Sequence, residues 1–227
     1  MGPARNRTHE AGRVAVIAAR TQILDAIRRG LGARAVDREK EYRAVTREYV
    51  QDGLLDRDQR VELFVQRIQH YDGGVHRCGR GTVAETIAGA LSARVKRKLL
   101  VPEGFPAEWL PPGFEFVAET NLSYSALDGS DGVITTCTVA IATTGTIILC
   151  HGPGEGRRAA TLIPDYHLCL VDAQSIVETV PEGVRRIAAL KPRLVTTISG
   201  PSATADIEMT RIKGVHGPRT LEVVVVS

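Results

Sequence analysis

Aromatic residues and long basic runs are both scarce in this sequence. Phenylalanine, tyrosine and tryptophan make up 4% of the 227 residues, and the formal net charge is only +3. Proteins that bind nucleic acids usually combine a basic patch with aromatic side chains on which bases stack. The composition therefore argues against nucleic acid as a partner.

Long hydrophobic segments are also missing. The apolar run at residues 14–19 lies between Arg13 and Arg20, whereas a helix that spans a membrane needs about 20 apolar residues. The run is likewise too short and wrongly flanked for the core of a signal peptide. We therefore expect a cytoplasmic protein that does not insert into a membrane.

The sequence has no pair of closely spaced cysteines. Its four cysteines are scattered along the chain: Cys78, Cys137, Cys150 and Cys169. Zinc sites and iron–sulfur clusters held by one chain usually draw on closely spaced cysteine ligands. We therefore expect no metal site and no cofactor on this chain, and interpret the cysteines as small apolar side chains.

Hydrophobic spacing divides the chain into two parts. Residues 1–72 are predicted to form a helical N-terminal region, because residues 16–31 carry an apolar stripe at helical spacing. Tyr42, Val45 and Tyr49 continue that spacing and predict a second helix. From residue 73 to residue 227 the pattern changes to strands that alternate with helices.

Three further helix starts can be located from capping residues. Asp56 and Gln59 form a capping-box pattern, and Thr82 and Glu85 form another. Pro181 suits the first turn of a helix that ends before the next proline. Each start is followed by apolar residues at helical spacing.

Several short segments of the second part are continuously apolar, which is typical of strands covered on both faces. Strands are expected at residues 98–102, 114–117, 132–136, 139–142, 146–150, 168–172, 193–199 and 221–226. The pattern predicts an α/β fold with an open, largely parallel sheet flanked by helices, and with a helical N-terminal extension.

One polar segment follows the expected strand at residues 193–199. Ser202, Thr204 and Asp206 are typical helix-capping residues, and ligands of open α/β sheets bind beyond the carboxyl ends of strands. A helix start at that place would offer N–H groups to an anion. His216 follows on a loop next to Gly217. The alternative is a well-capped turn without a ligand.

Two other segments carry candidate polar groups. Gly145 is expected at a tight turn between two apolar segments, and His151 follows on a loop. Arg157 and Arg158 could clamp a carboxylate or phosphate there, although a solvated loop is the alternative. His167 lies at the entrance of a strand. No Walker A loop, dinucleotide fingerprint, nucleophile elbow or His-Glu metal helix is present.

Three segments together resemble the LUD-domain family, and within it the lactate utilization protein C group. They read AIATTGTIIL, LIPDYHLCLVDAQSIVETVPE and ISGPSATADIEMTRIKGVHGP. The resemblance extends from about Val75 to the last strand. It implies a fold similar to the NagB/RpiA/CoA-transferase-like proteins. Members of the family are implicated, with two iron–sulfur partner proteins, in the oxidation of L-lactate to pyruvate.

The resemblance also implies the residues of a ligand pocket. Asp206 and His216 are the expected catalytic residues, and one of them would act as acid or base if the chain is a free-standing enzyme. The expected ligand-binding residues are Thr144, Gly145, Thr146, Gly200, Ser202, Thr204, Glu208 and Gly217. Thr143 departs from the family pattern, in which many relatives carry an acidic residue. Threonine lacks a nucleophilic carboxylate, so covalent CoA transfer by this chain is not expected.

The resemblance implies an accessory subunit of a lactate-oxidising system, which binds a small carboxylate or other anion. The iron–sulfur clusters are expected on partner subunits, because oxidation of lactate needs an electron acceptor that these residues do not supply. The alternative is a free-standing enzyme that acts on a phosphorylated or CoA-linked metabolite. A third interpretation is an interaction protein with no ligand. Whether the chain is itself catalytic, and whether it forms a homo-oligomer, is left open.

Overall fold

The computed structural model describes residues 6–31, 37–204, 212–213 and 217–227. The chain divides into two compact units, Met1–Tyr49 and Val50–Ser227, which are described separately. No helix among the described residues is both long enough and apolar enough to span a membrane. The boundary expected after residue 72 stays a prediction.

The first unit contains two helices, α1 (Asn6–Leu31) and α2 (Arg38–Ala44). The helix expected over residues 16–31 is therefore confirmed. The expected continuation of the second helix to Tyr49 is wrong, because Val45 is extended and ends α2. Tyr42, Val45 and Tyr49 are all more than half exposed. A short helix without tertiary packing is only marginally stable, which explains why the apolar spacing does not extend it.

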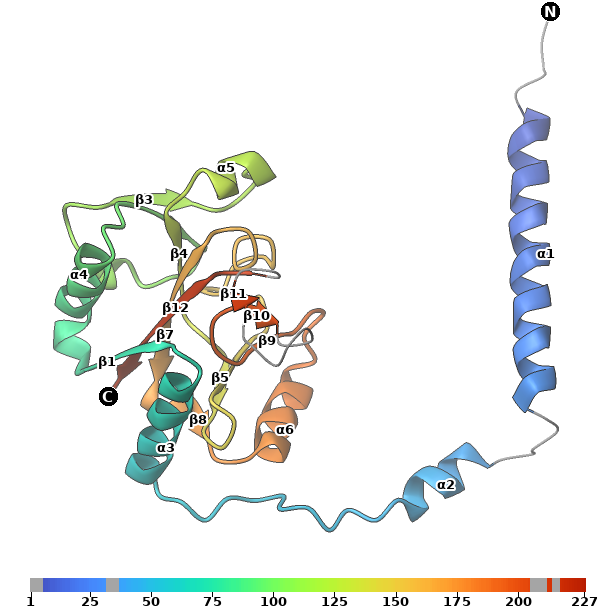
Figure 1. Cartoon of the computed structure of the whole chain (residues 1–227), viewed down its shortest axis with the longest axis horizontal. Helices are drawn as coiled ribbons and strands as arrows, with labels where there is room; N and C mark the ends of the chain where they lie inside the picture. Colours follow the sequence, from blue (N-terminus) through green and yellow to red (C-terminus); the bar gives the residue numbers. More distant parts are fainter. Residues whose placement is uncertain (1–5, 32–36, 205–211, 214–216) are drawn as a thin grey trace, which may run out of the picture. The chain divides into compact units, whose positions relative to one another are not determined.

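The second unit is built on a six-stranded sheet, which we call the first sheet (Figure 1). Its strands, in spatial order, are β1 (Gly74–Cys78), β12 (Thr220–Val226), β7 (Tyr166–Asp172), β4 (Gly132–Thr135), β2 (Lys98–Val101) and β3 (Glu115–Ala118). Every neighbouring pair is parallel. The predicted α/β class with an open parallel sheet is confirmed, as is the helical N-terminal region.

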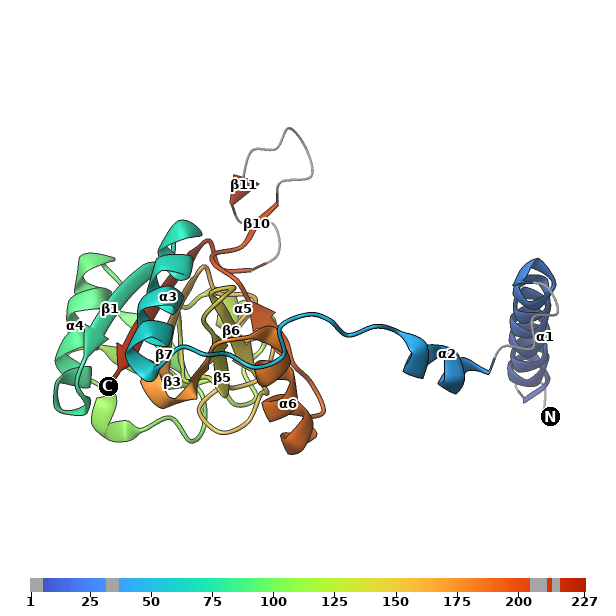
Figure 2. The ribbon, with the colours of Figure 1, turned by 90° about the horizontal axis from the view of Figure 1, so that it is seen from below.

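Two helices cover opposite faces of the first sheet, α3 (Arg57–His70) and α4 (Val83–Ala93) (Figure 2). The alternation of side chains along β7 explains this arrangement. Cys169 and Val171 pack in the same core cluster as α3, whereas Leu168 and Leu170 pack in the cluster that contains α4. Strands buried on both faces read as continuous apolar runs, as the sequence predicted.

The helix starts match the capping patterns in two of three cases. Asp56 and Gln59 form both hydrogen bonds of a capping box at the start of α3. The helix expected at Pro181 is α6 (Val180–Leu190), and it too begins with a capping box, which the sequence analysis missed. The box expected at Thr82 is absent. A 3-10 turn, η1 (Arg80–Thr82), precedes α4, and the Thr82 hydroxyl donates to the carbonyl of Gly79.

Four of the remaining strands form a separate sheet, which we call the second sheet. Their order is β8 (Ile176–Val177), β5 (Val139–Ile141), β6 (Thr146–Leu149) and β9 (Thr196–Ile198). β6 is antiparallel to both of its neighbours. The sequence analysis predicted β5, β6 and β9 as strands but did not separate them from the parallel sheet.

The second sheet lies between two helices. Ala140, Ile147 and Leu149 share a core cluster with α3, while Ile141 and Ile148 form a cluster against α6. The predicted tight turn at Gly145 joins β5 to β6 and is confirmed. Its φ of 59° lies in the left-handed region that favours glycine.

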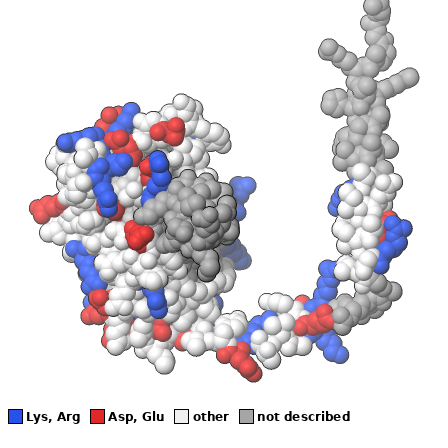
Figure 3. Space-filling view, in the orientation of Figure 1, with Lys and Arg blue, Asp and Glu red and all other residues white. Residues whose placement is uncertain are grey.

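The remaining elements are short. They are the 3-10 turns η2 (Ala107–Trp109) and η3 (Ala173–Ser175), the helix α5 (Tyr124–Asp128), and a two-residue ladder of β10 (Ala203–Thr204) with β11 (Ile212–Lys213). The helix start expected after Gly200 is therefore wrong, because Thr204 is in a strand. On the face of the second unit seen in Figure 3, basic and acidic side chains are interspersed.

The packing of α3 predicts a large stability loss for one substitution. Phe64 is 0% exposed and lies where α3 meets the side chains of both sheets. Phe64→Ala should lower the free energy of unfolding by about 3–5 kcal/mol, because it removes buried area and leaves a cavity. Urea unfolding followed by circular dichroism measures this. Leu54→Ala is the control, since Leu54 is 96% exposed. Equal stability losses for the two variants would contradict the packing described.

Candidate functional site

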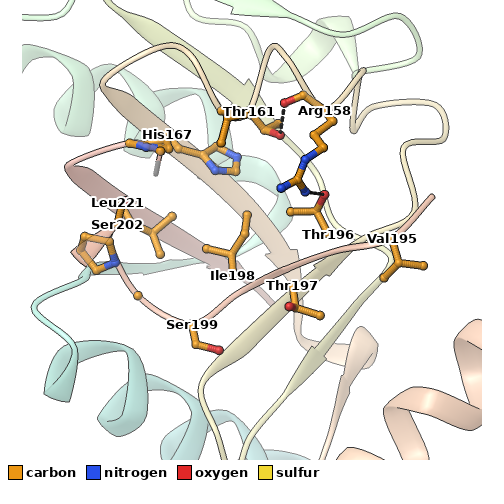
Figure 4. Close-up of a pocket in the computed structure, with 15 residues that line it drawn as sticks. Arg158, Thr161, His167, Val195, Thr196, Thr197, Ile198, Ser199, Ser202 and Leu221 are labelled. Atoms are coloured by element: carbon orange, nitrogen blue, oxygen red, sulfur yellow. Dashed lines mark hydrogen bonds between the residues drawn. The ribbon is translucent and has the colours of Figure 1, made fainter. Parts of the chain in front are cut away.

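A cavity of about 370 Å³ lies between the two sheets of the second unit. His167 and Leu221 line it from the first sheet, and Thr196 and Ile198 line it from β9 (Figure 4). Arg158 reaches it from the loop that follows β6. We call this space the inter-sheet cavity.

The inter-sheet cavity lies at the amino ends of β7 and β12. His167 and Leu221 are paired across these strands, and each is the second residue of its strand. This cavity is therefore not at the carboxyl ends of the parallel sheet, where the sequence analysis expected a site. The polar segment does follow the carboxyl end of β9, but β9 belongs to the second sheet. Because β9 is not parallel to its neighbour β6, the carboxyl-end rule does not apply to it.

Arg158 is the cationic group of the inter-sheet cavity. Its Nη1 donates to Oγ1 of Thr196 at 2.8 Å. His151 lies on the other side of the same hydroxyl, with 2.7 Å between Nε2 and Oγ1 of Thr196 and 2.7 Å between Nδ1 and the carbonyl oxygen of Gly156. A carbonyl only accepts, so Nδ1 donates to it, and Nε2 is the ring nitrogen that contacts the Thr196 hydroxyl. This chain of hydrogen bonds holds the guanidinium at the cavity.

The neighbouring arginine has a different role. Arg157 Nε donates to Oε2 of Glu119 at 2.9 Å, and its backbone N–H donates to Oε1 of the same carboxylate. Arg157 thus neutralises a buried carboxylate of its own chain. Arg158, in contrast, forms no ion pair within the described part of the chain. Of the two arginines, Arg158 is therefore the one available to an anionic ligand.

His167 supplies a neutral polar group to the cavity wall. Its side chain is almost completely buried, and Nε2 lies 2.8 Å from Oγ1 of Thr135 on the adjacent strand β4. Burial lowers the pKa of His167 from its ordinary 6.5 to about 4. The imidazole is therefore uncharged at neutral pH, next to a site whose charge comes from Arg158.

A larger cavity, of about 850 Å³, lies beyond the carboxyl ends of β2 and β3. Glu119 and Arg157 line it, but they are paired with each other. Within the described ranges no group of three His, Cys, Asp or Glu side chains is arranged to hold a metal ion. We therefore take the inter-sheet cavity, which is lined by residues 199–202, 217 and 218 of the third sequence motif, as the candidate site.

Comparison with known proteins identifies the family. A family model described as the LUD domain matches residues 61–226. The chain belongs to the LUD-domain family. It is 45% identical over 176 residues to lactate utilization protein C of Deinococcus radiodurans, a match that covers 76% of this chain and 82% of that protein. It is also 35% identical over 94 residues to lactate utilization protein C of Shouchella clausii, covering 39% of this chain and 41% of that protein.

A solved structure is similar as well. The crystal structure of a DUF162 family protein from Deinococcus radiodurans superposes with a TM-score of 0.67 at 39% sequence identity, and it covers 77% of this chain and 100% of that chain. The resemblance to the lactate utilization protein C group of the LUD-domain family is confirmed by these matches.

Some of the residues predicted for this LUD domain meet at the inter-sheet cavity. Gly200, Ser202 and Gly217 line it. The backbone N–H of Ser202 donates to the carbonyl of Pro218 at 2.9 Å, which joins two segments that both line the cavity. Gly200 has a φ of 82°, and a Cβ there would lie 2.4 Å from Cβ of Tyr71. The roles proposed for these residues stay predictions.

The Thr144-Gly145-Thr146 motif of the LUD domain lies on the other face of the second sheet. Thr144 and Thr146 line a cavity of about 550 Å³ between that sheet and α6. Their hydroxyls are 2.7 Å apart, and Oγ1 of Thr146 lies 2.8 Å from Oγ of Ser199. Ser199 lines both cavities, so it joins this motif to the inter-sheet cavity. Gly145 instead packs against α3, where a Cβ would lie 2.7 Å from Cβ of Arg67.

Four predicted residues remain without a described environment. Asp206, Glu208 and His216 lie outside the described residues, and for Thr204 only the backbone of β10 is described. Their roles stay predictions. Thr196 and Ile198 line the cavity but were not singled out by the sequence analysis, which did name Arg158 and His167 among its candidate polar groups. The signal for His167 was a single histidine near the start of a largely apolar strand.

The low pKa of His167 predicts a pH-dependent stability. Between its ordinary pKa of 6.5 and about 4, the unfolded chain binds a proton that the folded protein does not. The contribution of His167 to the free energy of unfolding is therefore complete above pH 6.5, and it is lost as the pH falls to about 4. Each tenfold difference in proton affinity is worth about 1.4 kcal/mol, so the loss amounts to about 3 kcal/mol.

Urea unfolding of the wild-type protein and of His167→Gln, across that pH range, measures this loss. Glutamine can still hydrogen-bond Thr135 but does not titrate, so the variant should lose about 3 kcal/mol less stability than the wild type between pH 6.5 and pH 4. If both proteins lose stability equally over this range, His167 is not held neutral by burial.

Proposed function

We propose that this chain is an accessory subunit of an L-lactate oxidation system, and that its inter-sheet cavity binds the small carboxylate that this system oxidises or produces. The first support is the similarity to lactate utilization protein C over 76% of the chain. The second support, which carries the proposal for the ligand, is Arg158 at the cavity, for which the described residues provide no ion-pair partner.

The size and polarity of the cavity suit a small carboxylate. A volume of about 370 Å³ is at the small end of the range for ligand pockets. A guanidinium held by Thr196 offers its remaining N–H groups to a carboxylate, and such charge-assisted hydrogen bonds are about twice as strong as neutral ones. Ser199 and Ser202 also line this cavity.

The proposal assigns binding and orientation, rather than electron transfer, to this chain. Oxidation of lactate to pyruvate removes two electrons and two protons, and arginine, serine and neutral histidine side chains do not accept electrons. We assign the electron acceptor to partner subunits that carry iron–sulfur clusters. The chain's contribution is a charged anchor that fixes the position of the carboxylate.

Arg158 also supports a second candidate, because a guanidinium binds phosphate as well as carboxylate. On this alternative the chain is a free-standing enzyme that acts on a phosphorylated or CoA-linked metabolite. The two candidates differ in the ligand that stabilises the protein, so ligand binding separates them.

Arg158→Gln should weaken the binding of L-lactate and pyruvate by about 10-fold to 100-fold, since hydrogen bonds to charged groups contribute about 1.5–3 kcal/mol. Isothermal titration calorimetry measures the dissociation constants. Arg57→Gln is the matched control, because Arg57 lies at the start of α3 and pairs with the exposed Asp58. Equal affinities for the two variants would place the carboxylate elsewhere. Stabilisation by phosphate compounds or CoA esters, but not by lactate or pyruvate, would favour the second candidate.

The accessory role predicts a physical complex. Tagged protein purified under mild conditions from its own cells grown on lactate should carry partner proteins with the optical absorption of iron–sulfur clusters. The preparation should reduce a dye when lactate is added, and removal of this chain should lower that activity. A colourless protein that is recovered alone and is inactive with lactate would contradict the accessory role.

A further inference from the structure

His167 is fixed in the cavity wall by its backbone and by one hydrogen bond. It lies in β7, which is paired with β4 on one side and β12 on the other. Nε2 lies 2.8 Å from Oγ1 of Thr135, and both side chains are almost completely buried. The ring therefore cannot turn without breaking this contact. Figure 4 shows His167 and Arg158 on one side of the cavity, with Thr196 and Ile198 of β9 on the other.

The second ring nitrogen faces the cavity. Among the described residues, Nδ1 of His167 has no hydrogen-bond partner. In the described part of the chain, the side-chain nitrogens or oxygens that are both inaccessible to solvent and without a hydrogen-bond partner are Nε of Arg60 and Nε2 of His76. Nδ1 of His167 is not one of them. An unpartnered atom that is accessible must border an open space. The inter-sheet cavity is the space that His167 lines.

The hydrogen bond to Thr135 decides which nitrogen carries the proton. The Thr135 hydroxyl is buried, and His167 is its hydrogen-bond partner in the described structure. A buried hydroxyl proton needs an acceptor, and Nε2 is the acceptor within reach. Thr135 therefore donates to Nε2. A neutral imidazole that accepts at Nε2 carries its proton on Nδ1.

We propose that His167 is a ligand-binding residue, whose Nδ1–H donates a hydrogen bond to the oxygen on C2 of a carboxylate that Arg158 anchors. The ligand class is a small 2-hydroxy or 2-oxo monocarboxylate. This inference rests on the proposed function, because it takes the carboxylate at Arg158 as given. It adds a specificity determinant, since a carboxylate without oxygen on C2 leaves the Nδ1–H without a partner.

The charge state of His167 fits this role. Burial lowers its pKa to about 4, so the ring stays a neutral donor at physiological pH. Among the described residues that line the cavity, Arg158 is the one cation. A neutral donor beside a cation binds the uncharged C2 oxygen without adding a second charge to be desolvated.

The first experiment determines the tautomer without any ligand. Nitrogen-15 NMR of histidine-labelled protein distinguishes Nδ1–H from Nε2–H in a neutral imidazole, and His167→Gln assigns the signal. We expect the Nδ1–H form in the wild type and in Thr135→Ser, which keeps the hydroxyl. Thr135→Val should lose this preference. An Nε2–H form in the wild type overturns the proposal.

The second experiment compares L-lactate, pyruvate and propionate as probes of the same site. Calorimetry with the wild-type protein should give propionate an affinity at least 10-fold lower than that of pyruvate, because a site built to hydrogen-bond an oxygen discriminates against the analogue that lacks it. His167→Asn keeps an N–H donor near the position of Nδ1 and should retain most of this preference. His167→Leu should lose it while all three ligands still depend on Arg158.

The outcomes distinguish this proposal from the proposed function. If the three carboxylates bind with equal affinity and Arg158→Gln weakens all of them, the carboxylate site stands and the role of His167 is overturned. If none of them binds to the wild-type protein, the carboxylate site itself fails. If His167→Leu does not fold, the tautomer in Thr135→Val and the preference of His167→Asn still decide the question.

Discussion

The pairing of β7 with β12 along their full lengths is the constraint on which the rest of the second unit depends. Side chains alternate along each strand, so Tyr166 and Glu222 turn to one face, and His167 and Leu221 to the other. On the first face the Tyr166 hydroxyl donates to Glu222 at 2.8 Å. On the second face His167 reaches the inter-sheet cavity. A shift of register by one residue would exchange these faces and place tyrosine at the cavity and histidine beside α4.

The elements that depend on local sequence were predictable. The capping box at Asp56 locates α3, and Gly145 locates the turn between β5 and β6. The apolar runs locate five of the six strands of the first sheet, but not β1, which the sequence analysis missed. Each of these signals depends on a few neighbouring residues, so it can be recognised without knowledge of the tertiary contacts. The family was also predictable, because its motifs retain their order and spacing along the chain.

The features that depend on tertiary contacts were not predictable from spacing. Nothing local distinguishes a strand of the second sheet from one of the first, because β5 and β6 are as apolar as β4. For the same reason the sequence analysis did not predict a cavity at the amino ends of β7 and β12. Arg157 and Arg158 are adjacent in sequence, and only the fold brings Glu119 to the first and Thr196 to the second. The orientation of the His167 ring depends on Thr135, which is on a different strand.

The two walls of the inter-sheet cavity differ in how firmly they are held. His167 lies in a central strand with hydrogen-bonded neighbours on both sides, whereas β9 is the edge strand of the second sheet and is paired only with β6. An edge strand can move at the cost of one set of backbone hydrogen bonds, and a central strand cannot. β9 is therefore the wall of the cavity that can be displaced at the lower cost, whereas the wall that holds His167 is fixed by paired strands on both sides.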